Sequence, residues 1–346
     1  MLWFWIGFVV FVLLMLALDL GVFHREAHTV SFKESAVWVT VWVLLAVVFG
    51  SCIPLYHPGG TKAAIEYFTG YILEQSLSMD NVFVIALIFT YFRVPQQYQH
   101  RVLFWGIIGV LVMRGAMIAV GAKLIDEFHW VLYLFGAFLV YTGIKMAFSG
   151  EDDDISPDQN FVVRFVKRFI PVHTQFVGQD FFTRIDGKLF ATPLFVVLLI
   201  VETTDLIFAV DSIPAIFGVT TDPFIVFTSN VFAVLGLRSL YFLLAGAMGL
   251  FRYLKLGLSI VLVFVGVKML ELHHLLLPKE SAIAHFLEEY KHTISLSVIV
   301  GVLVISVIAS LYAAKYFPEA EHGEADLAGE EPALPPDSPL IEDGTA

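Results

Sequence analysis

The chain has 346 residues, of which 58% are hydrophobic and 15% are charged, and its formal net charge is −12. A soluble globular protein is about half apolar and about a quarter charged, so this composition predicts an integral membrane protein. Residues 318–346 hold nine acids and no Lys or Arg, and without them the net charge is −3. This nearly neutral body has no basic patch for nucleic acid, and the single cysteine excludes a disulfide framework.

Nine stretches are apolar over about the 20 residues that a membrane-spanning helix needs. In chain order they lie near residues 3–22, 36–53, 68–92, 102–121, 129–148, 191–217, 224–247, 256–275 and 294–316. The first begins without a basic region or a small-residue cleavage site, so we expect a retained span and not a signal peptide. The predicted fold class is an all-α, polytopic membrane protein of nine transmembrane helices.

Basic residues in the loops predict how the chain is oriented. Nine crossings place the termini on opposite sides of the membrane. With the N-terminus outside, the predicted inner loops contain twelve Lys or Arg residues and the outer loops contain four. Because inner loops of membrane proteins are enriched in these residues, we expect a multi-pass protein with its N-terminus outside and its C-terminus in the cytoplasm.

The third to fifth spans resemble the sixth to eighth. The matched polar positions are Glu74 with Asp205, Asp80 with Asp211, Asn81 with Ser212, Arg114 with Arg238, and Lys145 with Lys268. Three crossings are an odd number, so the second unit would enter the membrane from the opposite face. Inverted repeats of this kind are typical of secondary transporters, whose binding sites lie near the midplane between the repeats.

These features divide the chain into six segments. They are two N-terminal spans at 1–66, a first three-helix repeat at 67–148, a cytoplasmic segment at 149–190, a second repeat at 191–275, an outer loop and last span at 276–317, and an acidic tail at 318–346. Within the cytoplasmic segment, bases at Arg164, Lys167 and Arg168 predict a helix on the membrane surface. The pair Asp186-Gly187 predicts a hairpin, and the Pro-rich tail is expected to be disordered.

Ten charged residues fall well inside the predicted spans, away from the span ends. The acids are Asp19, Glu74, Asp80, Glu202, Asp205 and Asp211, and the bases are Arg114, Lys145, Arg238 and Lys268. An Asp at the centre of a membrane helix costs about 2.5–3.5 kcal/mol to insert, so these groups need partners or water. Pairing acids with bases is one solution, but it leaves an excess of two negative charges, which a divalent cation or protons would neutralise.

Spacing and ligand chemistry narrow the kind of cation. Glu202 and Asp205 are three residues apart and project from one helical face. Pro214 cannot donate to the carbonyl of Val210, so we expect a local break that frees an oxygen ligand beside Asp211. Neutral oxygens nearby belong to Asn81, Ser212 and Asn230. Oxygen ligands suit hard divalent ions such as Mg²⁺, Ca²⁺ and Mn²⁺.

Other chemistries lack their motifs. There is no His-Glu-x-x-His sequence for a metalloprotease and no phosphate-binding glycine loop. We therefore expect neither an enzyme nor an ATP-driven pump, and no prosthetic group.

Two long motifs resemble the signatures of the TerC integral membrane protein family. They are TGYILEQSLSMDNVF at 69–83 and VETTDLIFAVDSIPAI at 201–216. The resemblance covers nearly all of residues 1–317. It implies a bacterial inner-membrane protein of the subgroup tied to manganese efflux at alkaline pH. It also implies the metal ligands, which are Glu74, Asp80, Glu202, Asp205 and Asp211, and places Asp19 in a recurring first-span motif.

Two interpretations from different classes remain. In the first, the protein is a secondary transporter that exports Mn²⁺ in exchange for protons. In the second, it is a membrane scaffold or insertion partner in which the acids fix helix packing or bind metal statically. The repeat favours transport, because alternating access exploits that symmetry. Protein partners and the oligomeric state are not predicted by the sequence.

Overall fold

The computed structural model of the chain describes residues 2–18, 32–148, 171–173, 175–185, 187–244, 253–270 and 291–316. Three predictions lie outside these residues: the surface helix around Arg164, the first-span acid Asp19, and the disordered tail at 318–346. The backbone of Asp80 belongs to a helix, but its side chain is also outside the description.

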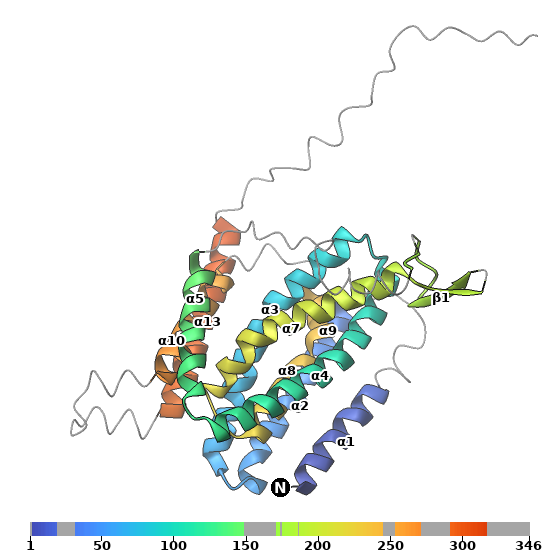
Figure 1. Cartoon of the computed structure of the whole chain (residues 1–346). Coiled ribbons are helices and arrows are strands. Elements are labelled where there is room, and N and C mark those ends of the chain that lie inside the picture. The colour runs from blue at the N-terminus through green and yellow to red at the C-terminus, as the bar shows by residue number, and fades with distance from the viewer. Residues whose placement is uncertain are drawn as a thin grey trace, which may run out of the picture.

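The described part of the chain is a helical bundle with one small hairpin (Figure 1). The helices are α1 (Leu2–Leu18), α2 (Phe32–Tyr56), α3 (Gly60–Tyr91), α4 (Gln96–Glu127), α5 (Val131–Phe148), α7 (Pro193–Phe217), α8 (Pro223–Leu235), α9 (Leu237–Leu244), α10 (Leu254–Met269) and α13 (Lys291–Tyr316). Seven stretches of helix are long and apolar enough to cross a membrane, with α8 and α9 counted as one. The predicted all-α, multi-pass membrane fold is confirmed.

The helices α3 and α4 extend well beyond the spans predicted for them. α3 and α4 each have 32 residues. At 1.5 Å per residue such a helix is about 48 Å long, whereas the hydrocarbon core of a bilayer is about 30 Å thick. A helix of this length has to tilt or extend beyond the hydrocarbon. Hydropathy marks only the part of a helix that lies in lipid, which is why the sequence underestimated both helices.

The positions of the helix breaks correct the sequence analysis. The break expected at Pro214 does not occur, because α7 continues through this residue to Phe217, and the N–H of Gly218 donates to the Pro214 carbonyl at 3.0 Å. A proline removes one hydrogen bond, and the bonds on either side keep the helix going. The break falls instead in the next predicted span, where Gly236 separates α8 from α9.

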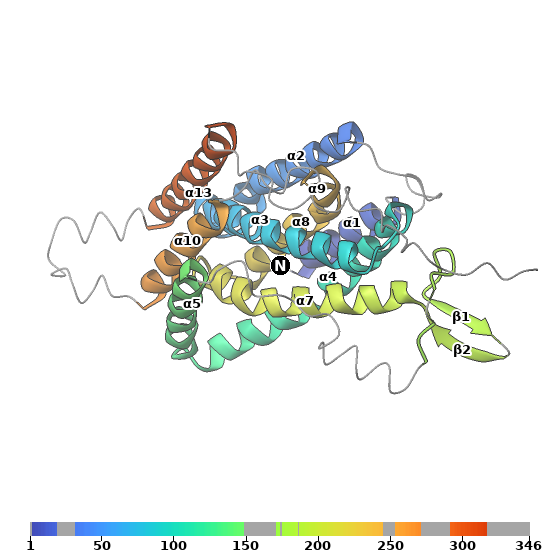
Figure 2. The ribbon, with the colours of Figure 1, turned by 90° about the horizontal axis from the view of Figure 1, so that it is seen from above.

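The predicted hairpin is confirmed. Strands β1 (Phe182–Ile185) and β2 (Lys188–Ala191) pair antiparallel, with Ile185 opposite Lys188. Gly187 in the connecting turn has a φ of +77°, a conformation that suits glycine because it has no Cβ. The hairpin projects from the end of the bundle where α7 begins (Figures 1 and 2).

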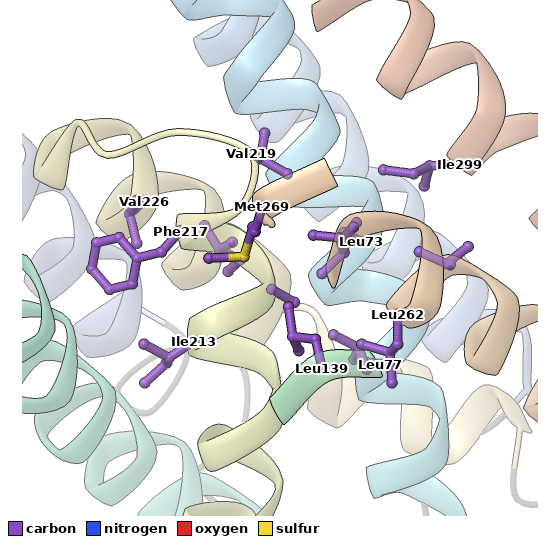
Figure 3. Close-up of a cluster of buried hydrophobic side chains, with 14 of the residues drawn as sticks. Leu73, Leu77, Leu139, Ile213, Phe217, Val219, Val226, Leu262, Met269 and Ile299 are labelled. Carbon is purple, nitrogen blue, oxygen red and sulfur yellow. The ribbon is translucent and has the colours of Figure 1, made fainter. Parts of the chain in front are cut away.

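The helices form two groups. α5, α10 and α13 gather on one side of the bundle, and the hairpin lies on the opposite side (Figure 2). The remaining helices pack around α3 and α7, which open the two predicted repeats. A cluster of buried apolar side chains joins the groups: it includes Leu73 from α3, Phe217 from α7, Leu139 from α5 and Leu262 from α10 (Figure 3). This cluster fixes α3 and α7 side by side, and both helices carry acids.

Candidate metal centre

A buried arginine joins the two predicted repeats. Arg114 lies on α4 with 2% of its surface exposed, Glu74 on α3 is fully buried, and Asp205 on α7 is 5% exposed. The guanidinium donates two hydrogen bonds to Asp205, from Nε to Oδ2 at 3.1 Å and from Nη2 to Oδ1 at 3.0 Å. Its Nη1 donates to Oε1 of Glu74. One base therefore holds an acid from each repeat.

Two asparagines complete this group. The Nδ2 of Asn81, on α3, donates to Oδ1 of Asp205 at 3.2 Å. The Nη1 of Arg114 also lies 3.4 Å from Oδ1 of Asn230 on α8. Side chains from four helices thus converge on one point in the bundle. Each of these polar groups is buried, so the hydrogen bonds offset the cost of removing the groups from water.

Three polar atoms in this group could still form hydrogen bonds. Among the described residues, Oε2 of Glu74, Oδ1 of Asn81 and Nδ2 of Asn230 have no hydrogen-bond partner. Buried polar atoms are nearly always paired, so these atoms indicate a place for water, a cation or a second arrangement of the site. A small space of about 20 Å³ lies beside Asp205 and Asn81 and is lined also by Thr204 and Arg238. That volume admits one small species.

Charge is unbalanced within the group. Two carboxyl groups face one guanidinium, so ionisation of both would leave one negative charge in a buried setting. A buried charge without compensation is costly by several kcal/mol. Acids outnumber bases in this group, as they do among all the charged residues of the predicted spans.

Glu202 and Asp211, the other predicted acids whose side chains the structure describes, form no ion pair with Arg114. Glu202 is half-buried on α7 and packs against Gly109 of α4. A Cβ added to Gly109 would lie 1.9 Å from the Oε1 of Glu202. The other carboxylate oxygen, Oε2, has no hydrogen-bond partner among the described residues. The glycine therefore makes room for this carboxylate between two helices.

Asp211 and the remaining predicted residues occupy other parts of the bundle. Asp211 is half-buried on α7, six residues after Asp205. Lys145 of α5 interacts with it electrostatically. Its neighbour Ser212 is buried. Arg238, the repeat partner of Arg114, is buried with its Nη1 3.0 Å from Nε2 of His100. The structure thus brings together Glu74, Asp205, Asn81, Asn230 and Arg114, and leaves Glu202, Asp211, Ser212, Lys145 and Lys268 outside this group.

The described part of the chain contains no preformed metal-binding site of several His, Cys, Asp or Glu side chains. No group of three or more His, Cys, Asp or Glu side chains there is arranged to hold a metal ion. The side chains of Asp80 and Asp19 fall outside that statement. The metal-binding role of the five acids remains a prediction.

The structure adds a second polar region that the sequence analysis missed. A cavity of about 620 Å³ lies at the ends of the helices, between the α2–α3 and α7–α8 turns and the start of α13; we call it the end cavity. Two His–carboxylate pairs lie there, with N···O distances of 3.2 Å: His57 with Asp222, and His292 with Glu66. Thr220 donates to Glu66 at 2.6 Å and connects the α7–α8 turn to α3.

Two sequence signals could have identified part of this region. Asp222 precedes Pro223, and an Asp-Pro pair is typical of a helix start. Its Oδ1 indeed accepts from the N–H of Phe224 at 2.9 Å. Glu66 lies eight residues before Glu74, so a predicted span that began two residues earlier would have placed both acids on α3. Neither signal predicts the histidines, which reach the cavity from the α2–α3 turn and from α13.

Comparison with known proteins agrees with this architecture. The family model described as the integral membrane protein TerC family matches residues 59–316. Over 317 residues the chain is 49% identical to an uncharacterized membrane protein, STKORF319, of Myxococcus xanthus, covering 92% of this chain and 94% of that protein. A Shigella flexneri protein named "Putative membrane-bound redox modulator Alx" is 45% identical over 315 residues, which cover 89% of this chain and 94% of the relative.

A third relative, an uncharacterized membrane protein of Rickettsia bellii, is 39% identical over 308 residues, which cover 89% of this chain and 96% of that protein. No solved structure matches the chain. The family model covers well over half of the sequence, and it includes every helix from α3 to α13. The chain belongs to the TerC family of integral membrane proteins.

Proposed function

We propose that this protein is a secondary transporter that exports a divalent cation, with Mn²⁺ as the preferred substrate, in exchange for protons. One observation carries the proposal: Glu74 from the first repeat and Asp205 from the second meet at the buried guanidinium of Arg114. Secondary transporters built from inverted repeats bind their substrates at such a junction, near the middle of the membrane.

Arg114 takes the place of a cation in this proposal. Its guanidinium neutralises part of the charge of Glu74 and Asp205 while the site holds no ion. An arriving cation competes for the same carboxylate oxygens and displaces the guanidinium. The unpaired oxygens of Glu74 and Asn81 add further acceptor atoms. All of these atoms are oxygens, which favours a hard ion such as Mn²⁺ over ions that prefer thiolate or imidazole.

Protons complete the exchange. A carboxylate binds a metal ion only after losing its proton, so cation binding releases protons, and proton binding releases the cation. Glu202 lies one turn from Asp205 on α7 and is the described acid nearest in sequence to the Arg114 group. The space beside Gly109 would allow the Glu202 carboxylate to hold a proton, or to coordinate the ion when the helices move.

Flux in proteoliposomes tests the proposal. Purified protein is reconstituted with a Mn²⁺-sensitive dye inside the vesicles, and uptake is followed with and without a pH gradient. We expect wild type to move Mn²⁺ and Asp205→Asn to lose at least 90% of the flux. Glu127→Gln is the matched control, because Glu127 ends α4 with its side chain 55% exposed. Wild-type flux no faster than in empty vesicles would contradict the proposal.

One observation favours the scaffold as a second candidate. Arg114 and Asn81 hold Asp205 with three hydrogen bonds, as a static structural ion pair would. The two candidates differ for the paired substitution Arg114→Gln/Asp205→Asn, which removes one charge of each sign. A scaffold would keep its cellular phenotype in this variant, and a transporter would lose it.

The name of the Shigella flexneri relative mentions redox modulation. This chain has one cysteine, Cys52, which is free. A thiol–disulfide cycle within a single chain needs two cysteines. A redox effect of this protein would therefore not rest on a disulfide cycle within one chain.

A further inference from the structure

An apolar groove runs between α1 and α2. It has a volume of about 400 Å³, and its walls include Phe8 and Phe11 of α1, Phe49 and Cys52 of α2, and Phe232 of α8. The groove is distinct from the Arg114 group and from the end cavity. Nothing in the proposed transport cycle uses it.

The groove exists because α1 is held to its neighbours by long aromatic side chains. The ring of Phe8 lies 5.4 Å from the ring of Phe49 and 5.8 Å from that of Phe232. Trp5 contacts the ring of Phe224 at 5.3 Å. Rings of this size keep helix backbones apart. At Gly7, which lines the groove, an added Cβ would meet no atom within 4 Å.

A polar atom lies at one end of the groove. Tyr56, the last residue of α2, stacks on Phe4 at a ring distance of 4.8 Å and lines the groove. Its hydroxyl is shielded from solvent and has no hydrogen-bond partner among the described residues. Trp3 and Trp5 begin α1 at the same end. Tyr and Trp are enriched where membrane helices reach the lipid headgroups, so this end of the groove lies at headgroup level.

We propose that the groove binds one phospholipid, with an acyl chain between the rings of Phe8 and Phe49 and a headgroup or ester oxygen that accepts a hydrogen bond from Tyr56. An acyl chain matches the apolar walls, and the lipid oxygens provide the acceptor that the hydroxyl lacks. A phospholipid offers both. The bound lipid would fill the space between α1 and α2 and hold α1 against the bundle.

Lipid retention measures this binding directly. The full chain is purified in detergent with added 1-palmitoyl-2-oleoyl-phosphatidylethanolamine, washed with lipid-free detergent, and weighed by native mass spectrometry. We expect wild type to retain one lipid through washes that remove loosely associated lipid. Gly7→Leu adds a side chain to the lining of the groove at a position where a Cβ meets no atom within 4 Å, and it should lower retention at least tenfold. Leucine is the better helix former, so this change favours α1 itself.

Two further variants separate specific binding from the lipid that surrounds every membrane protein. Tyr56→Phe removes only the hydroxyl and should lower retention roughly threefold to tenfold, the effect of one hydrogen bond. Leu13→Phe, on an exposed face of α1 outside the groove, should retain lipid as wild type does. Equal retention by wild type and Gly7→Leu, or loss of all lipid from wild type, would mean surrounding lipid only and would overturn the proposal.

Discussion

Arg114 is the residue on which the candidate site depends. It contacts both Glu74 and Asp205, and all three are nearly or fully buried. Breaking a buried ion pair by removing one partner is usually destabilising by about 3–5 kcal/mol, because a charge is left behind without compensation. Removing both partners costs much less. Stability and transport can therefore be separated at this residue.

We expect Arg114→Gln to lower the melting temperature and membrane abundance, because two buried carboxylates lose their counter-charge. The pair Arg114→Gln/Asp205→Asn should recover most of that stability by removing one negative charge, and it should still fail to transport. Thermal unfolding in detergent and Mn²⁺ flux give the two readouts. An unchanged melting temperature for Arg114→Gln would show that the carboxylates are not charged in the folded protein.

Gly109 tests the placement of Glu202. A side chain at this position would collide with the Glu202 carboxylate, whereas one at Gly301 on α13 would meet no atom within 4 Å. We expect Gly109→Ala to displace Glu202 and to reduce Mn²⁺ flux several-fold, and Gly301→Ala to leave flux near wild type. Equal effects of the two substitutions would remove the functional role that we assign to the room beside Glu202.

At the scale of elements, α5 and α10 pack through glycines. A Cβ on Gly136 would lie 3.0 Å from the carbonyl oxygen of Gly266, and one on Gly143 would lie 2.9 Å from that of Ser259. The offset of 123 residues that relates Lys145 to Lys268 also relates Gly136 to Ser259 and Gly143 to Gly266. Each contact therefore maps onto the other when the two units are exchanged. Contacts of this kind are those of two antiparallel helices, and the inverted repeat itself stays a prediction from the sequence.

The close approach of α5 and α10 predicts a strong effect of added volume. We expect Gly266→Ala to destabilise the protein by about 1–3 kcal/mol, a typical cost of overpacking, because its Cβ would meet the Gly136 carbonyl at 2.7 Å. Gly301→Ala on α13 is the control, since nothing lies within 4 Å of the added atom. Thermal unfolding of both variants checks the prediction, which is wrong if they unfold at the same temperature.

The sequence predicts elements better than it predicts partners. Apolar runs and the Asp-Gly turn determine local structure, so the spans and the hairpin follow from them. The convergence of Glu74, Asp205 and Arg114 depends on how α3, α4 and α7 are rotated against one another, which hydropathy does not specify. Glu74 and Asp80 are six residues apart and about 120° apart around a helix. Both are acids inside one span, but the sequence does not show which of them faces Arg114.

At the scale of the whole molecule, apolar packing separates the Arg114 group from the end cavity. Phe217, Val219 and Met269 line that cavity and belong to the same buried cluster as Leu73, the residue next to Glu74 (Figure 3). An ion that passes between the two regions has to part this cluster. Transport would therefore require α3, α7 and α10 to move relative to one another.

The acids of the two repeats should respond to pH and to substitution as one set. Protons and Mn²⁺ compete for the same carboxylate oxygens, so lowering the pH protonates the ligands and weakens binding, and raising it strengthens binding. We expect Mn²⁺ affinity to rise across about pH 6 to 9, by up to roughly tenfold per pH unit for each proton released. Isothermal titration of purified wild type at several pH values measures this slope.

Substitutions at the shared site should not add. Glu74→Gln and Asp205→Asn each remove one of the two carboxylates that Arg114 brings together. Either change alone would disable a site that needs both, so the pair should cost little beyond a single substitution. The pH slope should flatten in the same variants, because fewer protons are released on binding. Losses that add in the double variant, together with an unchanged slope, would place Glu74 and Asp205 in separate sites.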